Sequence, residues 1–415
     1  MLKLSKRFLT FTLILMLFVA TVSYASASNL DENDALVAPD EDTILEVAIS
    51  KVLHLPKGTN IPNATFNFIA TGISVDDNTD PDIVADMEGL NNLSVTYTFT
   101  ESDEKGMAGI NEIVIETDNI FEGVVFPHAG IYVYEITEEE NTNPFIDDED
   151  NHNEWLSYSK AAYTLTVYVA DHSDGGTYIY AVGTQIKHND DGEDAEGKVD
   201  PTPGSNNDTY THSQMIFNNK YVKTNEPEDP DPTKYAALFV KKMVSGTFAS
   251  KDQYFEFDIT LAVPQLGQPI PSHFKAYIVD EDGLVGDSPI EVASNGLTTF
   301  SLKHGQRLVF VDTPVGTGYV VTEAGATHYT PSVTVITNGV TPGTTIPGAS
   351  EQDLTTGNQL VGENDNSTVF TNTRADVTPT GLNLKDIPFI GLIVLGLGAL
   401  VTYIMLNVRR KANHN

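Results

Sequence analysis

The stretch RLVFVDTPVGTGYVVTE, Arg307 to Glu323, decides the fold. It holds two short runs of β-branched and aromatic residues on either side of a turn of Pro, Gly and Thr, which is typical of two strands joined by a turn. The second run ends on a carboxylate, Glu323, among residues that a strand would bury. Far upstream, YVYEITE ends in the same way at Glu138. A glutamate repeated at the end of a buried strand calls for a chemical explanation.

Most of the chain between its two ends shows the same strand pattern. Short segments alternate apolar with polar residues, and clusters of Gly, Pro, Asn and Asp separate them. No segment there carries a long apolar period of 3.6 residues, which a helix would need. The sequence therefore predicts an all-β protein built from antiparallel sandwiches. Examples of the strands are ILEVAISKVLHL, AAYTLTVYVA, GTYIYAVGTQIK and DQYFEFDITLAV.

The two ends of the chain depart from this pattern. Residues 1–27 join three basic residues to an apolar stretch and the sequence ASA, which predicts a signal peptide, with an uncleaved membrane anchor as the alternative. Residues 387–408 are apolar and long enough to cross a bilayer as a helix, with a buried soluble helix as the alternative. The basic tail 409–415 is expected to stay in the cytoplasm, so the region before the helix would face outward.

Composition excludes several kinds of site. The 415 residues include no cysteine, which rules out disulfides, thiolate metal sites and cysteine nucleophiles. A formal net charge of −35 disfavours nucleic acid and anionic membrane as partners. The acidic runs DDEDNHNE, from Asp147, and DDGEDAEG, from Asp190, lack the spacing of a helix-loop-helix calcium site, so solvated loops are favoured over cation sites. Because no hydrolase, zinc-protease or phosphate-loop motif is visible, we expect no cofactor, no metal and no enzyme acting on an external substrate.

A linker divides the central region. KTNEPEDPDPT, residues 223–233, contains three prolines and four acidic residues, which fit neither a helix nor a central strand. The flanking segments, 42–222 and 234–375, repeat three phrases in the same order, so we expect two duplicated domains. Each has a strand with a lysine, a strand ending in Thr-Glu and a closing strand with an asparagine: Lys51, Glu138 and Asn219, then Lys242, Glu323 and Asn372.

The repeated lysine, glutamate and asparagine would react if the fold buried them together; solvated strand ends are the alternative for each taken alone. In the first set, the residue two places before each is apolar, so strand alternation directs all three toward the core. Burial lowers the pKa of a lysine and raises that of a glutamate, which favours a neutral amine and a protonated acid. The amine is then a nucleophile, and the acid can polarise the amide and protonate departing ammonia. We predict isopeptide bonds, with Glu138 and Glu323 as the catalytic residues.

These phrases also resemble a known family. The segment FSLKHGQRLVFVDTPVGTGYVVTE is similar to the collagen-adhesin B-type domain of Gram-positive surface proteins, which is an Ig-like β-sandwich. From about Ile44 to Gly381, the chain resembles two-domain backbone pilins of the streptococcal T-antigen type. The resemblance implies two tandem Ig-like sandwiches in which a lysine of the first strand is bonded to an asparagine of the last. Those bonds would join Lys51 to Asn219 and Lys242 to Asn372.

A sorting signal is predicted just before the apolar run. VTPTGLNLKD, within residues 376–386, resembles the pilin variant of the signal that sortases cleave. The resemblance implies cleavage between Thr380 and Gly381 and transfer of Thr380 to an amine. The family's acceptor lysine corresponds here to His212, which cannot form the amide. Lys198, in an inserted segment that we expect to be an exposed loop, is our candidate acceptor, with an ordinary surface lysine as the alternative.

The sequence therefore predicts a structural pilus subunit on the surface of a Gram-positive bacterium, secreted and anchored to the cell wall. Its partners would be a sortase, cell-wall peptidoglycan and other pilin subunits. The alternative is a monomeric wall-anchored adhesin that binds a host or neighbouring-cell ligand.

Overall fold

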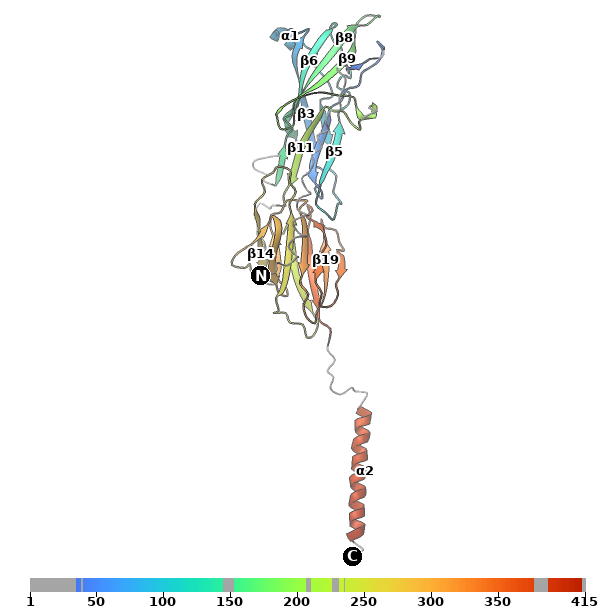
Figure 1. Ribbon diagram of the computed structural model, residues 1–415, viewed down its shortest axis with the longest axis vertical. Coiled ribbons are helices and arrows are strands. Elements are labelled where there is room, and N and C mark those ends of the chain that lie inside the picture. The colour runs from blue at the N-terminus through green and yellow to red at the C-terminus, as the bar shows by residue number, and fades with distance from the viewer. Residues whose placement is uncertain are drawn as a thin grey trace, which may run out of the picture.

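Two β-sandwiches lie end to end in the protein, and a separate helix, α2 (Ile387–Ala412), follows them in the chain (Figure 1). This computed structural model describes residues 35–38, 40–144, 153–206, 210–225, 231–234, 236–376 and 387–412. The predicted fold class, tandem β-sandwiches with a C-terminal helix, is confirmed. The predicted signal peptide lies outside the described residues, as do 377–386 of the sorting region and 413–415 of the basic tail.

The first sandwich packs a seven-stranded sheet against a four-stranded one. The larger sheet has the order β1-β9-β8-β6-β3-β4, with β10 also paired to β9, and the smaller has the order β5-β2-β11-β7. The strands are β1 (Leu36–Val37), β2 (Ser50–Pro56), β3 (Ala64–Val75), β4 (Ser94–Tyr97), β5 (Ile110–Glu116), β6 (Gly130–Asn143), β7 (Glu154–Ser157), β8 (Ala162–Asp171), β9 (Thr177–His188), β10 (Asp194–Val199) and β11 (Ile216–Lys223). Two short helices, α1 (Pro81–Ala85) and η1 (Gly204–Asn206), lie in its connections.

The second sandwich pairs a seven-stranded with a five-stranded sheet. Their orders are β15-β14-β17-β12-β23-β19-β20 and β16-β13-β18-β21, with β22 also paired to β18. The strands are β12 (Leu238–Ser245), β13 (Phe255–Ala262), β14 (His273–Val279), β15 (Ile290–Ala293), β16 (Asn295–Leu302), β17 (Arg307–Phe310), β18 (Gly318–Glu323), β19 (Thr330–Ile336), β20 (Thr344–Pro347), β21 (Leu354–Thr355), β22 (Gln359–Leu360) and β23 (Ser367–Thr373).

Strand alternation places the glutamates inside. Along β6, Tyr132, Tyr134 and Ile136 are buried at two-residue spacing, and Glu138 is the next member of the same series. Along β18, Tyr319 and Val321 lead in the same way to Glu323. Because successive side chains of a strand point to opposite faces, each glutamate faces the core that its apolar predecessors fill.

Each sandwich places the lysine strand beside the asparagine strand. β2 pairs with β11, and β12 pairs with β23, and both pairings are parallel. Parallel neighbours need a long crossover, and here the rest of the sandwich supplies it. Lys51 pairs with Phe217, which lies two positions before Asn219 on β11. Lys242 pairs with Phe370, which lies two positions before Asn372 on β23. Segments distant in the sequence therefore bring amine and amide to adjacent strands.

The junction between the sandwiches is tightly packed. Lys223 at the end of β11 forms an ion pair with Glu363 of the second sandwich at 2.8 Å. Thr224 bridges to Pro314. Gly316 has a φ of +82°, and a Cβ there would lie 2.3 Å from the Cβ of Pro56, so both conformation and space require glycine. The predicted linker 223–233 thus begins inside a packed junction, and its residues 226–230 lie outside the described part.

Helix α2 fits the predicted membrane segment. Residues Phe389–Arg410 have a mean hydropathy of 2.5 over their most apolar window, and none of that window is buried inside the protein. A helix of 22 residues is long enough to cross the hydrocarbon core of a bilayer. Its apolar side chains are exposed, as expected of a helix that lipid surrounds rather than one in a soluble core.

Candidate functional site

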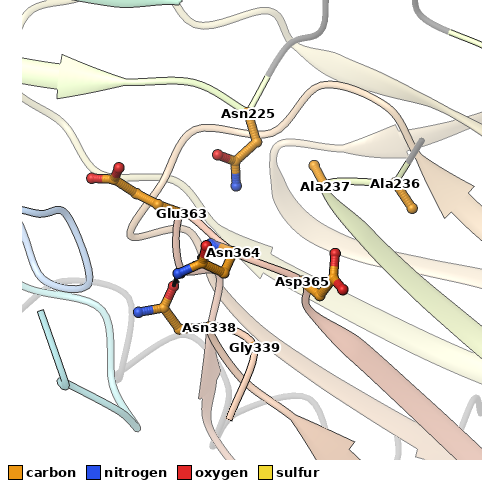
Figure 2. Close-up of a pocket in the computed structure, with 8 residues that line it drawn as sticks. All are labelled: Asn225, Ala236, Ala237, Asn338, Gly339, Glu363, Asn364 and Asp365. Carbon is orange, nitrogen blue, oxygen red and sulfur yellow. Dashed lines mark hydrogen bonds between the residues drawn. The ribbon is translucent and has the colours of Figure 1, made fainter. Parts of the chain in front are cut away.

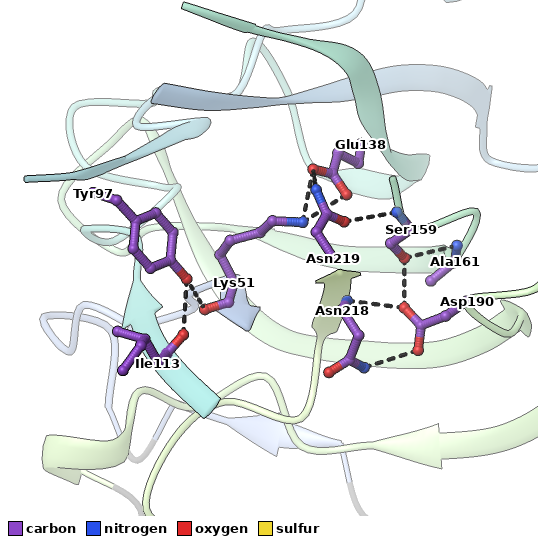
Figure 3. A network of polar contacts seen from close by, with 9 residues as sticks. All are labelled: Lys51, Tyr97, Ile113, Glu138, Ser159, Ala161, Asp190, Asn218 and Asn219. Carbon is purple, nitrogen blue, oxygen red and sulfur yellow. Dashed lines mark hydrogen bonds and ion pairs between the residues drawn. The ribbon is translucent and has the colours of Figure 1, made fainter. Parts of the chain in front are cut away.

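The first candidate site brings together Lys51 from β2, Glu138 from β6 and Asn219 from β11 (Figure 3). The Lys51 Nζ lies 2.7 Å from each oxygen of the Glu138 carboxylate. The Asn219 Nδ2 donates a hydrogen bond of 2.7 Å to Glu138 Oε1. Lys51 and Asn219 are fully buried and Glu138 is 7% exposed, so amine, acid and amide meet in the core of the sandwich.

Burial shifts the proton equilibria of the pair toward neutrality. It lowers the pKa of Lys51 to about 8, because a charged ammonium is poorly solvated there, although Glu138 opposes the shift. Burial raises the pKa of Glu138, and Lys51 opposes that shift. The Phe66 ring lies 4.8 Å from the Lys51 Nζ and helps keep water from it. The two pKa values approach each other, which makes the neutral amine and neutral acid accessible.

The amide oxygen of Asn219 has its own hydrogen-bond donor. The backbone N–H of Ser159, between β7 and β8, donates to Asn219 Oδ1 at 2.7 Å (Figure 3). The Ser159 hydroxyl donates to Asp190 Oδ1 at 2.5 Å, and the same carboxylate accepts bonds from the backbone and side chain of Asn218. Asp190 lies in a turn, as expected of the acidic run, but it is only partly exposed, and its carboxylate accepts three hydrogen bonds from Ser159 and Asn218 rather than only from solvent.

The second candidate site repeats the three side chains with Lys242 from β12, Glu323 from β18 and Asn372 from β23. The Lys242 Nζ lies 2.6 Å from Glu323 Oε1, and the Asn372 Nδ2 donates to the same oxygen at 2.9 Å. Burial lowers the pKa of Lys242 to about 8 and raises that of Glu323. Within the described part of the chain, Asn372 Oδ1 and Glu323 Oε2 have no hydrogen-bond partner.

Both arrangements are suited to amide exchange. An amine and a primary amide contact one carboxyl group, which can take a proton from the amine and give one to the leaving nitrogen. The fold fixes the reactants next to each other, which removes the entropy cost of bringing them together. The six predicted residues thus form two compact triads, which sequence reasoning had to assemble from phrases far apart in the chain.

Lys198 is not placed as expected. It lies on β10, opposite Gln185 of β9, and is partly buried. The expectation of an exposed loop was wrong here because residues 194–199 continue the larger sheet as an added strand. Thr380 and Gly381 lie outside the described residues.

A polar pocket of about 460 Å³ lies at the junction between the sandwiches (Figure 2). Its side chains bond one another, since Asn338 Oδ1 accepts from the backbone and the side chain of Asn364. No group of three histidine, aspartate or glutamate side chains placed to hold a metal occurs among the described residues. The pocket holds no arrangement comparable to the triads. Its lining residues are Asn225, Ala236, Ala237, Asn338, Gly339, Glu363, Asn364 and Asp365.

Comparisons with known proteins agree with this architecture. Residues 47–222 match the model of the Spy0128-like isopeptide containing domain, and residues 236–374 match a domain of unknown function, DUF7601. A pilin of Streptococcus pyogenes serotype M1 is 26% identical over 360 residues, which cover 83% of this chain and 85% of that protein. The pilus tip adhesin Cpa of Streptococcus pyogenes is 33% identical over 96 residues, 23% of this chain and 12% of the adhesin.

Solved pilin structures are also similar. The major pilin of Streptococcus pyogenes shares 21% identity over 80% of this chain and 99% of its own, with a TM-score of 0.30. The T3.2 major pilin of the same species shares 20% identity over 80% of this chain and 98% of its own, with a TM-score of 0.28. The first sandwich thus matches the Spy0128-like isopeptide containing domain, and the predicted resemblance of the chain to streptococcal pilins is confirmed.

Proposed function

We propose that this protein is a structural subunit of a surface pilus and that two isopeptide bonds, Lys51 to Asn219 and Lys242 to Asn372, close its sandwiches. The observation that supports this most is the recurrence of one buried lysine, glutamate and asparagine arrangement in both halves of the chain. Two buried charged pairs are costly to keep for stability alone. Their repetition is explained if each pair reacts.

The reaction is an exchange of one amide nitrogen for another. The neutral Lys51 amine attacks Cγ of Asn219, and the bond from Cγ to Nδ2 breaks. The amine gives up one proton and Nδ2 gains one, so ammonia leaves and a secondary amide remains. Glu138 carries that proton, first as an acid beside the amide and then as a base toward the amine. Lys242, Asn372 and Glu323 take the same roles in the second sandwich.

The bonds would protect the subunit against pulling. Each joins the first long strand of a sandwich to its last strand and closes a loop of about 170 or 130 residues, a constraint worth about 5 kcal/mol on the unfolded chain. Tension entering at one of these strands passes to the other through a covalent bond. The strands between them then carry little load, which suits a cysteine-free protein exposed to shear.

Attachment would follow from the segment around Thr380. A sortase would cleave between Thr380 and Gly381 while α2 holds the chain in the membrane, and Thr380 would then be joined to an amine. In a pilus that amine belongs to another subunit, for which Lys198 on β10 is our candidate, and at the base of the pilus it belongs to cell-wall peptidoglycan.

Wall extracts on a denaturing gel test this proposal. A pilus subunit gives a ladder of high-mass species, and Thr380→Ala abolishes it. Lys198→Arg, which keeps the charge but changes the amine, should abolish the ladder if Lys198 is the acceptor, and Lys187→Arg on neighbouring β9 is the matched control. A single band from the wild-type chain, with its sortase present, would instead support a monomeric adhesin that binds a host or neighbouring-cell ligand.

A further inference from the structure

We propose that the backbone N–H of Ser159 is the oxyanion donor of the first triad, and that Asp190 is the residue that positions it. This inference rests on the proposed isopeptide function and concerns how fast the first bond forms. The donor also distinguishes the two triads, because the amide oxygen of Asn372 in the second triad has no hydrogen-bond donor among the described residues.

The Ser159 N–H fixes which way the Asn219 amide faces. A side-chain amide presents an acceptor oxygen on one side and a donor NH₂ group on the other. If the amide were reversed, its NH₂ would face the Ser159 N–H, and two donors would oppose each other. The N–H therefore holds Oδ1 toward Ser159 and Nδ2 toward Glu138. The nitrogen that must leave as ammonia is thus held against the acid that protonates it.

The same N–H stabilises the charge that develops during attack. When the Lys51 amine adds to Cγ of Asn219, the electrons of the carbonyl double bond move to Oδ1, which becomes an oxyanion. The donor at 2.7 Å is already directed at that oxygen, in a site where water does not compete. As the tetrahedral species collapses, the carbonyl re-forms, Nδ2 leaves as ammonia with the proton from Glu138, and the Lys51 nitrogen gives one of its protons back to the carboxylate. No further reactant is needed.

Asp190 holds the donor in place from the far side. Its Oδ1 accepts bonds from the Ser159 hydroxyl at 2.5 Å and the Asn218 backbone N–H at 2.9 Å. Its Oδ2 accepts from Asn218 Nδ2 at 2.8 Å. Asn218 is the neighbour of Asn219 on β11, and Ser159 is 3% exposed. The carboxylate therefore ties the segment that carries the donor to the strand that carries the amide (Figure 3).

The second triad has the same three side chains but no hydrogen-bond donor to its amide oxygen among the described residues. On the β19 side Asn372 pairs with Pro331, and proline has no N–H to offer. Asn372 Oδ1 has no partner within the described residues, whereas Nδ2 still contacts Glu323. The amide there is held at one end only. The second sandwich thus serves as an internal reference in the same molecule.

The test follows both bonds in time. Chain expressed without the signal and membrane segments, and recovered unfolded in denaturant, is refolded by dilution and sampled by acid quench. Mass spectrometry with peptide mapping then counts the ammonias lost and assigns each loss to a sandwich. We expect Asp190→Ala to slow the first bond by about a hundredfold, as for a misplaced oxyanion donor, and to leave the second unchanged.

Three further variants separate positioning from general damage. Asp190→Asn keeps one acceptor oxygen for Ser159 and Asn218 and should restore most of the rate. Ser159→Ala keeps the N–H but removes its tether, so it should slow the first bond like Asp190→Ala, and the double variant should add little. Asp191→Ala removes a neighbouring exposed charge and should have no effect.

The pH dependence of the bond-forming rate distinguishes loss of positioning from entry of water into the triad. If Asp190→Ala let water into the triad, the pKa of Lys51 would rise from about 8 toward its ordinary value, and the alkaline limit of the rate would move up. The Asp190 charge itself raises the pKa of Lys51, so positioning predicts a lower rate whose alkaline limit stays in place or falls. An unchanged first rate in Asp190→Ala, or an upward shift of that limit, would overturn the inference. Absence of the first bond in the wild-type chain would instead overturn the proposed function.

Discussion

The two triads hold the same three side chains but support them differently. In the first, Lys51 contacts both carboxylate oxygens of Glu138, and the amide oxygen of Asn219 accepts a hydrogen bond from the backbone N–H of Ser159. In the second, Lys242 contacts one oxygen and the amide oxygen of Asn372 has no partner among the described residues. The pairing of amine with acid is therefore the common requirement. Control of the amide is an addition made by the first sandwich.

The largest expected effect comes from removing either glutamate. Glu138→Ala should prevent the first bond and Glu323→Ala the second, because the amine and amide then lack a group that moves the proton. Each variant should be lighter than the mass of its own sequence by one ammonia, whereas the wild-type chain is lighter than its sequence by two. The affected sandwich should lose about 5 kcal/mol of loop-closure stabilisation, in addition to the cost of a buried unpaired lysine. Mass spectrometry and thermal unfolding measure both.

A control for these variants lies on the same strand. Glu135 faces outward on β6 and pairs with Lys187 at the surface. Glu135→Ala should leave both bonds intact and change stability by less than about 1 kcal/mol. If Glu138→Ala still lost both ammonias, the assigned role of Glu138 would be wrong.

The next effect is a difference in rate between the two bonds of the unmodified protein. After refolding, the first should form about ten times faster or more, since one oriented donor to an oxyanion typically contributes at least that much. Timed digestion and peptide mapping give both rates from one sample. Equal rates, or a faster second bond, would show that the Ser159 N–H adds nothing to the triad.

Both bonds should respond to pH in the same way. The reactive form has a neutral amine and a protonated acid, so each pair must hold one proton. Above about pH 8, the lowered pKa of Lys51 and of Lys242, the pair loses that proton and the rate falls. Below the raised pKa of the glutamate, a second proton keeps the amine charged, and the rate falls again. A rate that climbs steadily to pH 10 would contradict this account.

The smallest effect concerns the junction. Lys223→Met removes the cation that pairs with Glu363 at 2.8 Å, and it should reduce the cooperativity between the sandwiches by about 1 kcal/mol. Lys234→Met, which breaks an exposed pair with Asp231, should change nothing measurable. Scattering profiles and thermal unfolding of the linked protein would detect the difference. Identical behaviour of the two variants would show that the ion pair does not stiffen the junction.

Sequence alone predicted the strands because alternation is a local property, and it predicted both triads because the same three phrases recur in the two halves of the chain. The apolar residues two places before Glu138 and Lys51 sufficed to direct these side chains inward. Ser159 could not be found in this way, since every residue except proline has a backbone N–H and only the folded chain shows which one meets Asn219. Asp190 was hidden in an acidic run that is typical of solvated loops.

Two other features depended on tertiary pairing. Lys198 was expected in a loop because Gly, Asp and Asn surround it, yet pairing with β9 turns the segment into a strand. Residues 223–233 were interpreted as a linker because of their prolines and acidic residues. The first of them, Lys223, forms an ion pair with Glu363 at a junction where Gly316 also fits against Pro56. The two residues of each contact are far apart in the sequence, so no local sequence pattern predicts the contact.

The most direct test of the central claim is the intact mass of the folded chain without residues 1–27 and 381–415. The account predicts a mass lower than that of the sequence by two ammonias, with digestion yielding one branched peptide that joins Lys51 to Asn219 and another that joins Lys242 to Asn372. A mass equal to that of the sequence, with all four residues recovered in linear peptides, would contradict it.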